Sequence, residues 1–173
     1  MKIYYDVLSE KLLNICKHDL LEQQKLPVWS SNLFHWNSDL VFNLDGTCLN
    51  THIENKVIKT LLTQELYSNP LKNLKGKISY QYYIWNAYSG IQPHDDHSYE
   101  FAATIYLNSN EIQDGGLFLW QDDLCKENFY KCLNPQENMM VVNDNKHEHF
   151  VTPVSPHRQE PRYTIQIFSN LNE

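Results

Sequence analysis

The sequence lacks the long apolar runs that mark membrane and secreted proteins. No segment approaches the roughly 18 consecutive apolar residues that a membrane helix needs, and Met1–Asp6 lacks the apolar run of a signal peptide. No two of the four cysteines form a Cys-x-x-Cys pair, which disfavours a zinc knuckle. We therefore expect no membrane partner, a cytoplasmic location and reduced thiols at Cys16, Cys48, Cys125 and Cys132.

Clusters of positive charge are also absent. The chain has 173 residues and a formal net charge of -7, and its lysines and arginines are scattered. This pattern disfavours a protein that tracks the phosphates of a nucleic acid. The apolar fraction of 42% and the charged fraction of 20% are ordinary for a globular protein. With no internal repeat or linker, residues 1–173 are expected to form a single domain with a substantial core.

Residues 1–75 are expected to provide helical support for the rest of the domain. Ser9 can cap a helix that runs to about Lys25, because leucines recur behind it at helical spacing. Thr51-His52-Ile53-Glu54 has the form of a capping box and predicts the start of a second helix. A stripe of apolar residues follows, and Asn69-Pro70 should end that helix.

Residues 76–170 predict a series of short strands. Residues 28–49 also carry β and turn signals, with Asp45-Gly46 as a predicted turn. Serial short strands separated by polar turns are typical of a sandwich or a barrel. Eight such runs follow one another in the second part of the chain: 77–86, 92–96, 99–108, 116–121, 130–134, 138–143, 148–154 and 161–169.

Two of these runs have one purely apolar side and one mixed side. The apolar sides consist of Ala103, Ile105 and Leu107 in the first run, and of Tyr163, Ile165 and Ile167 in the second. The mixed sides consist of Ala102, Thr104 and Tyr106, and of Arg162, Thr164, Gln166 and Phe168. Side chains alternate across a strand, so the two sides need different environments. We expect the apolar sides to pack under the helices and the mixed sides to line a ligand cavity.

The stretch Pro93-His94-Asp95-Asp96-His97 is the most informative part of the sequence. Side chains two residues apart on an extended strand point to the same face, so His94 and Asp96 can meet a single metal ion. Asp95 and His97 would face the opposite way. A second histidine downstream would complete the set of two histidines and one carboxylate that is typical of non-haem Fe(II) oxygenases. The alternative for this stretch is a solvated acidic turn.

The chain from Tyr82 to Asn170 resembles the Fe(II)/2-oxoglutarate-dependent oxygenases, in particular the prolyl-4-hydroxylase-like branch. The resemblance implies a mainly β fold, a double-stranded β-helix or jelly roll, with the N-terminal helices packed outside the major sheet. Its strength lies in the order of the motifs, since each is weak alone. The matching motifs are Pro93-His94-Asp95-Asp96, Phe101-Ala102-Ala103-Thr104-Ile105-Tyr106-Leu107-Asn108, Asp114-Gly115-Gly116-Leu117-Phe118, His149-Phe150-Val151-Thr152-Pro153-Val154 and Arg162-Tyr163-Thr164-Ile165-Gln166.

The resemblance implies that His94, Asp96 and His149 hold Fe(II) and form the catalytic centre. Strand parity cannot separate His149 from His147, because these two are themselves two residues apart. The motif around His149 favours it as the second histidine ligand. The carboxylate of Asp96 disfavours a halogenase, because halogenases of this kind free a metal position by lacking that ligand.

The resemblance also implies a site for 2-oxoglutarate as cosubstrate. Arg162 would pair with its distal carboxylate, a planar fork meeting a planar carboxylate. Thr164 and Tyr106 would donate further hydrogen bonds to it. Trp85 stands about where relatives have a tyrosine near the cosubstrate, so that contact departs from the family pattern. Arg158, near a loop proline, is expected to be a surface arginine.

The activity implied by the resemblance is hydroxylation of a C–H bond, with dioxygen and 2-oxoglutarate consumed and ascorbate as a reductant. The branch indicates a peptidyl proline as the prime substrate, while a free amino acid, a lysyl residue or a nucleic-acid base remain open. Loops at 26–50 and 121–137 are expected to set that choice. Two other functions also remain open: a non-catalytic jelly roll that binds a carboxylate or a partner, and a cupin-like iron dioxygenase without 2-oxoglutarate, which Arg162 disfavours.

Overall fold

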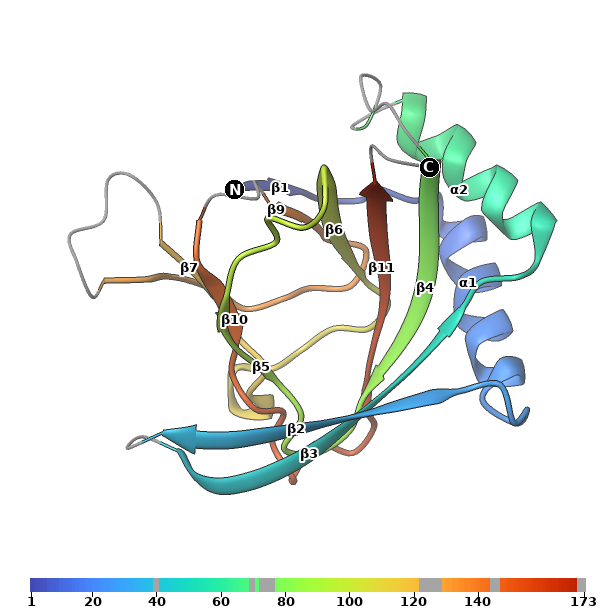
Figure 1. The fold of residues 1–173 in the computed structure, drawn as a ribbon. Coiled ribbons are helices and arrows are strands. Elements are labelled where there is room, and N and C mark those ends of the chain that lie inside the picture. Colours follow the sequence, from blue (N-terminus) through green and yellow to red (C-terminus); the bar gives the residue numbers. More distant parts are fainter. Residues whose placement is uncertain (39–40, 69–70, 72–76, 122–128, 144–146, 171–173) are drawn as a thin grey trace.

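The computed structural model describes the chain except residues 39–40, 69–70, 72–76, 122–128, 144–146 and 171–173 (Figure 1). The described residues form two antiparallel sheets, one of seven strands in the order β1-β9-β6-β11-β4-β3-β2 and one of four in the order β5-β10-β7-β8. The large sheet contains β1 (Lys2–Tyr4), β2 (Ser30–Ser38), β3 (Val41–His52), β4 (Lys77–Trp85), β6 (Phe101–Tyr106), β9 (Met140–Asn143) and β11 (Arg162–Asn170). The small sheet contains β5 (Ile91–His94), β7 (Phe118–Trp120), β8 (Lys131–Leu133) and β10 (His149–Val151).

Two helices, α1 (Glu10–Gln23) and α2 (Lys56–Ser68), cover the outer side of the large sheet, away from the small sheet (Figure 1). Ser9 caps α1 as predicted, since its hydroxyl accepts a hydrogen bond of 3.3 Å from the amide of Leu12. The apolar sides of β6 and β11 pack under the helices, which confirms the predicted separation of the two sides. The buried core on this side includes Leu12, Cys16 and Leu20 of α1, Leu62 and Leu66 of α2, and Ala103, Ile105, Ile165 and Ile167 of the sheet.

All eight predicted strands of the second part are present, as β4 to β11. A short 3-10 helix, η1 (Ile112–Asp114), lies between β6 and β7. The description of residues 1–75 as helical support is incomplete, because β1, β2 and β3 from this segment also join the large sheet. Neither α1 nor α2 is long and apolar enough to cross a bilayer. Of the predicted thiols, Cys16, Cys48 and Cys132 are free, and Cys125 lies outside the described residues.

The predicted capping box at 51–54 is wrong. Thr51 still belongs to β3, where it pairs with Tyr82 and its hydroxyl donates to the carbonyl of Val28 at 3.1 Å. The cap of α2 is Asn55, whose side-chain oxygen accepts from the amides of Val57 and Ile58 at 3.0 and 3.4 Å. Strand pairing has therefore overridden a local motif. The predicted end of α2 at Asn69-Pro70 lies outside the described residues.

The predicted turn at Asp45-Gly46 is also wrong, because both residues lie inside β3. The segment 26–50 is therefore largely a hairpin of β2 and β3, whose connection at 39–40 falls outside the described residues, as does 122–128 of the other predicted loop. Gly46 lets the backbone of β3 lie close to that of Ser89, because a Cβ at position 46 would be 2.1 Å from the backbone nitrogen of Ser89. A residue larger than glycine would not let β3 pass the backbone at Ser89 so closely.

Candidate functional site

A cavity of about 200 Å³ opens between the two sheets. The mixed sides of β6 and β11 form one wall, so the alternation predicted from the sequence holds on both sides of these strands. Side chains of the small sheet form the opposite wall. From the large sheet the lining includes Ala102, Thr104, Tyr106, Arg162, Thr164, Gln166 and Phe168, and from the small sheet Ile91, His94, Phe118, His149 and Val151.

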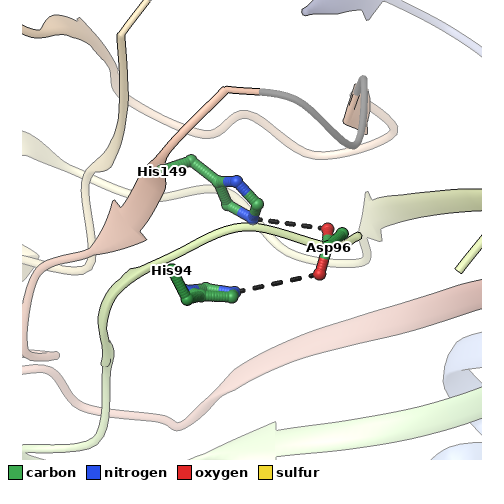
Figure 2. Close-up of side chains that lie close together, drawn as sticks. All are labelled: His94, Asp96 and His149. Atoms are coloured by element: carbon green, nitrogen blue, oxygen red, sulfur yellow. Dashed lines mark ion pairs between the residues drawn. The ribbon is translucent and has the colours of Figure 1, made fainter. Parts of the chain in front are cut away.

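Three potential metal ligands meet at this cavity (Figure 2). His94 ends β5 and His149 begins β10, and the two are direct partners in the strand pairing. One carboxylate oxygen of Asp96 lies 3.4 Å from Nε2 of His149, and the other lies 3.9 Å from Nε2 of His94. One ligand atom from each residue lies within 4.8 Å of the others. Asp96 lies two residues beyond His94, just after the end of β5, and its side chain reaches the same cluster as that of His94.

Backbone carbonyls select the same tautomer in both neutral imidazoles. Nδ1 of His94 lies 2.8 Å from the carbonyl oxygen of Gln92, and Nδ1 of His149 lies 3.1 Å from that of His147. A carbonyl oxygen only accepts, so in the neutral form of each ring the proton lies on Nδ1 and Nε2 keeps the lone pair. Both lone pairs belong to the atoms that approach Asp96. This is the state in which two imidazoles can bind a metal ion.

Asp96 supplies the negative charge of the cluster. Its burial would raise the pKa of the carboxyl, but the neighbouring His149, Asn143 and His94 outweigh burial and lower the pKa. The carboxylate therefore stays ionised at neutral pH. Two imidazoles and one carboxylate fit a divalent transition metal and leave metal positions open for other ligands.

The neighbouring residues lie apart from this cluster. His147 contributes its backbone carbonyl to His149, and its side chain is not part of the cluster. Asp95 and His97 are exposed and hydrogen-bond each other, as expected for residues that face away from His94. The cluster therefore contains the three residues that the sequence singled out, and neither of the alternatives.

Arg162 places a buried positive charge in the same cavity. Its side chain donates to the carbonyls of Gly116 and Gly115 and, at 2.8 Å, to the side-chain oxygen of Asn110. Burial lowers the pKa of Arg162 to about 10, so it stays charged at neutral pH. All three acceptors are neutral, and among the described residues Arg162 forms no ion pair. A buried charge without a counter-charge is costly, which favours an anion bound in the cavity.

The glycine pair of the Asp114-Gly115-Gly116 motif makes room for this arginine. Gly115 and Gly116 have φ angles of 65° and 59°, which favour glycine. A Cβ on Gly116 would lie 2.2 Å from the guanidinium nitrogen Nη2 of Arg162. The guanidinium therefore rests directly on the backbone of the motif, and only glycine permits that position.

Thr164 and Tyr106 line the cavity beside Arg162. Trp85 donates from its indole nitrogen to the hydroxyl oxygen of Thr164 at 3.0 Å, and Gln166 donates to the same oxygen at 3.4 Å. With its oxygen occupied as an acceptor, the Thr164 hydroxyl proton is left to donate elsewhere. Burial raises the pKa of Tyr106 to about 12, so its hydroxyl also keeps its proton as a donor.

The prediction that Arg158 is a surface arginine is wrong. Its side chain is only 5% exposed and pairs with Asp114 at 2.9 Å. It also donates at 2.6 Å to the Asn110 oxygen that accepts from Arg162. Asp114 is therefore engaged by Arg158 and leaves Arg162 without a carboxylate partner. The contacts join residues more than 40 positions apart, which a local pattern around Arg158 does not reveal.

Asn143, the last residue of β9, also lines the cavity and was not singled out from the sequence. Its side-chain nitrogen lies 2.5 Å from Oδ2 of Asp96 and 3.1 Å from Nε2 of His149. No sequence signal marks this asparagine, because its role depends on where β9 ends relative to two distant segments.

Comparisons with known proteins agree with this arrangement. A family model described as the 2OG-Fe(II) oxygenase superfamily matches residues 78–170. No curated relative matches the sequence.

Three similar solved structures each align with 98% of this chain. A Pseudomonas putida prolyl-4-hydroxylase is 12% identical, with 91% of that chain covered and a TM-score of 0.65. A Trichoplax adhaerens prolyl hydroxylase, in complex with a hypoxia inducible factor peptide fragment, is 16% identical, with 82% covered and a TM-score of 0.70. HygX from Streptomyces hygroscopicus, with nickel and 2-oxoglutarate bound, is 8% identical, with 82% covered and a TM-score of 0.64. These likenesses establish the jelly-roll fold.

Proposed function

Because the chain belongs to the 2OG-Fe(II) oxygenase superfamily, we propose that it hydroxylates a C–H bond of a peptidyl prolyl residue at the cavity between its two sheets. The observation that carries this proposal is the pairing of two features in one cavity. The cluster of His94, Asp96 and His149 presents Nε2 of two imidazoles and a carboxylate. Arg162 presents a buried charge that lacks a counter-charge among the described residues.

In this proposal His94, Asp96 and His149 hold Fe(II) through Nε2 of each imidazole and a carboxylate oxygen. When bound, Fe(II) and 2-oxoglutarate activate dioxygen, so that one oxygen atom enters the C–H bond and succinate and carbon dioxide leave. The protein's own task is to hold the donors in place. The carbonyls of Gln92 and His147 do so by fixing each imidazole through its Nδ1 proton.

The cosubstrate can be held at both of its ends. Along β11 the cavity-facing row begins at Arg162 and ends at Phe168. Phe168 pairs across to Ala102, which also pairs with Asn143, the residue that touches Asp96 and His149. Arg162 and the three residues of the metal cluster line the same cavity from different elements, so a dicarboxylate in that cavity can meet both. Thr164, two residues from Arg162 on β11, and Tyr106, which pairs with Thr164 across the sheet, are positioned as further donors.

The size of the cavity supports a substrate that inserts only a small group. Its volume of about 200 Å³ is below the roughly 300–1,000 Å³ of pockets that enclose drug-sized ligands. A single side chain that projects from a peptide fits a cavity of this volume, because the rest of the peptide stays outside the cavity. The rings of Tyr99 and Phe168, 4.6 Å apart between centroids, line the cavity and offer an apolar wall to an aliphatic ring. The Trichoplax adhaerens structure with its peptide fragment adds an analogy at the level of the fold.

The test is turnover with and without substrate. Purified protein with Fe(II), 2-oxoglutarate and ascorbate in air should form succinate slowly, and proline-containing peptides should accelerate it. N-oxalylglycine, which keeps both ends of 2-oxoglutarate, should inhibit competitively, and succinate should compete more weakly. A folded, iron-loaded sample that binds 2-oxoglutarate but never forms succinate would instead be a carboxylate-binding module. Acceleration by free amino acids and not by peptides would contradict the substrate class.

Trp85→Phe should raise the 2-oxoglutarate requirement without changing that for Fe(II). The indole N–H orients the Thr164 hydroxyl through a buried hydrogen bond of 3.0 Å. Such a bond contributes roughly 0.5–1.5 kcal/mol, so the KM for 2-oxoglutarate should rise about two- to tenfold. Trp120→Phe is the matched control, because Trp120 is also a buried tryptophan near the site, whereas the indole that donates to Thr164 is that of Trp85. An unchanged KM in Trp85→Phe would mean that the indole only fills space.

A further inference from the structure

Asn143 occupies the gap between two of the proposed metal ligands. Its Nδ2 lies 2.5 Å from Oδ2 of Asp96 and 3.1 Å from Nε2 of His149. Its place at the end of β9 is set by the backbone pairing of Asn143 with Ala102 on β6. The side chain is therefore carried on a strand of the large sheet, whereas both ligands come from the small sheet or its margin. Asn143 is thus a polar link between the two walls of the cavity.

The orientation of the amide follows from its two neighbours. The carboxylate oxygen of Asp96 is an acceptor, so the amide atom in contact with it must be the nitrogen. In the neutral ring of His149 the proton lies on Nδ1, facing the His147 carbonyl, so Nε2 is an acceptor as well. The reversed amide would place two acceptors against each other at 2.5 Å. A single NH2 group therefore serves both Asp96 and His149.

The oxygen atom of the Asn143 amide has no hydrogen-bond partner within the described residues. Oδ1 of Asn143 is buried and accepts no hydrogen bond there. Buried amide oxygens are normally paired, so this position is not explained by the stability of the folded chain alone. A leucine of similar shape would fill the same space without an unsatisfied atom. The polar side chain is therefore better explained by what it does to Asp96.

We propose that Asn143 is a positioning residue that fixes the Asp96 carboxylate and reserves one of its oxygens for the metal, an inference that rests on the proposed function. The hydrogen bond from Asn143 occupies Oδ2 of Asp96. The other oxygen, Oδ1, lies 3.9 Å from Nε2 of His94 and is left available to a metal. With a metal ion held by Nε2 of His149, the contact between this nitrogen and the Asn143 amide would be lost, and the hydrogen bond to Asp96 would remain. Asn143 would then order the Asp96 carboxylate both without and with the metal.

The experiment measures binding of Co(II), a spectroscopic substitute for Fe(II), to the metal-free protein without 2-oxoglutarate. Asn143→Leu keeps the volume and removes the hydrogen bond, and Asn143→Ala removes both. Each should bind Co(II) about ten- to a hundredfold more weakly, the usual effect of removing a partner that orients a metal ligand. The visible Co(II) bands should also shift, because Asp96 is free to bind through either oxygen. The melting temperature of the metal-free variants should stay close to that of the parent.

Asn138→Gly is the matched control. Asn138 is also a buried asparagine, and it holds the backbone of Leu8 with hydrogen bonds of 3.0 and 2.8 Å. Glycine suits its φ of 60°, so the variant should lose stability through the missing side chain alone. It should bind Co(II) as the parent does, with the same spectrum. A Co(II) affinity that fell in this control as well would mean that general destabilisation, and not Asp96, controls metal binding.

The outcomes separate this inference from the proposed function. Parent-like affinity and spectrum in Asn143→Leu would overturn the role of Asn143, while the metal site itself would stand. Weak binding in Asn143→Ala but not in Asn143→Leu would reduce the residue to a packing role. If Asn143→Leu does not fold, an unshifted Co(II) spectrum in Asn143→Ala overturns the inference. A parent that binds no Co(II), or a His94→Ala variant that binds it equally well, would refute the metal site and the inference with it.

Discussion

Replacing His94, Asp96 or His149 by alanine is expected to abolish succinate formation and leave a folded protein. The three residues supply every donor of the proposed metal site, and one ligand atom from each lies within 4.8 Å of the others. Losing a partner that merely orients a ligand already costs about ten- to a hundredfold in metal affinity, so losing a ligand should cost more than that. The fold should survive, because the buried core under α1 and α2 contains none of the three residues.

Two controls make this prediction specific. His147→Ala removes the imidazole two residues before His149 but keeps the backbone carbonyl that orients His149, so its activity should remain close to that of the parent. His97→Ala removes an exposed imidazole that is paired with Asp95 outside the cluster, and should behave in the same way. A dead His147→Ala beside an active His149→Ala would show that the wrong histidine has been assigned.

Thermal unfolding gives a second measurement that does not depend on turnover. A ligand that binds only the folded state stabilises it by about 2.7 kcal/mol when its concentration is a hundred times the dissociation constant. Adding a divalent metal should therefore raise the melting temperature of the parent under anaerobic conditions. The alanine variants should lose this increase while keeping the melting temperature of the metal-free parent. An equal increase in all proteins would place the bound metal elsewhere.

The features that the sequence predicted well depend on short-range geometry. Alternation along β6 and β11 is a property of any strand, so the division between a core side and a cavity side follows from a few consecutive residues. Arg162 and Thr164 were therefore placed on the cavity side, and Ile165 in the core, before any pairing was known. The proximity of His94 and Asp96 was also anticipated, since these residues are two apart at the end of β5.

The features that were missed depend on contacts between distant segments. Thr51 has a sequence typical of a helix cap, yet pairing with Tyr82 keeps it in a strand. Gly46 has a sequence typical of a turn, yet it serves the close passage of β3 over Ser89. Arg158 contacts the residues around Arg162, and Asn143 contacts the metal cluster, only because the fold brings Asp114 and Asp96 to them. Local propensity carries no information about such partners.

Arg162→Ala should raise the requirement for 2-oxoglutarate far more than the requirement for Fe(II). In the proposed complex the alanine variant leaves one carboxylate of the cosubstrate buried without its charge-assisted partner. That loss is expected to cost on the order of 2–5 kcal/mol, which corresponds to a rise of about 30- to 5,000-fold in KM for 2-oxoglutarate. Arg162→Lys keeps the charge but not the planar fork, so its KM should fall between those of the parent and Arg162→Ala.

The matched control for this variant is Arg158→Ala. Arg158 is a second largely buried arginine in the same network, but it pairs with Asp114 and does not line the cavity. Its loss should lower stability and change the KM for 2-oxoglutarate far less than the loss of Arg162. Co(II) affinity without cosubstrate should be unchanged in both variants, because neither arginine touches the metal cluster. Equal turnover of Arg162→Ala and the parent without any 2-oxoglutarate would instead identify an iron dioxygenase of the cupin-like kind, in which the buried charge of Arg162 serves another anion.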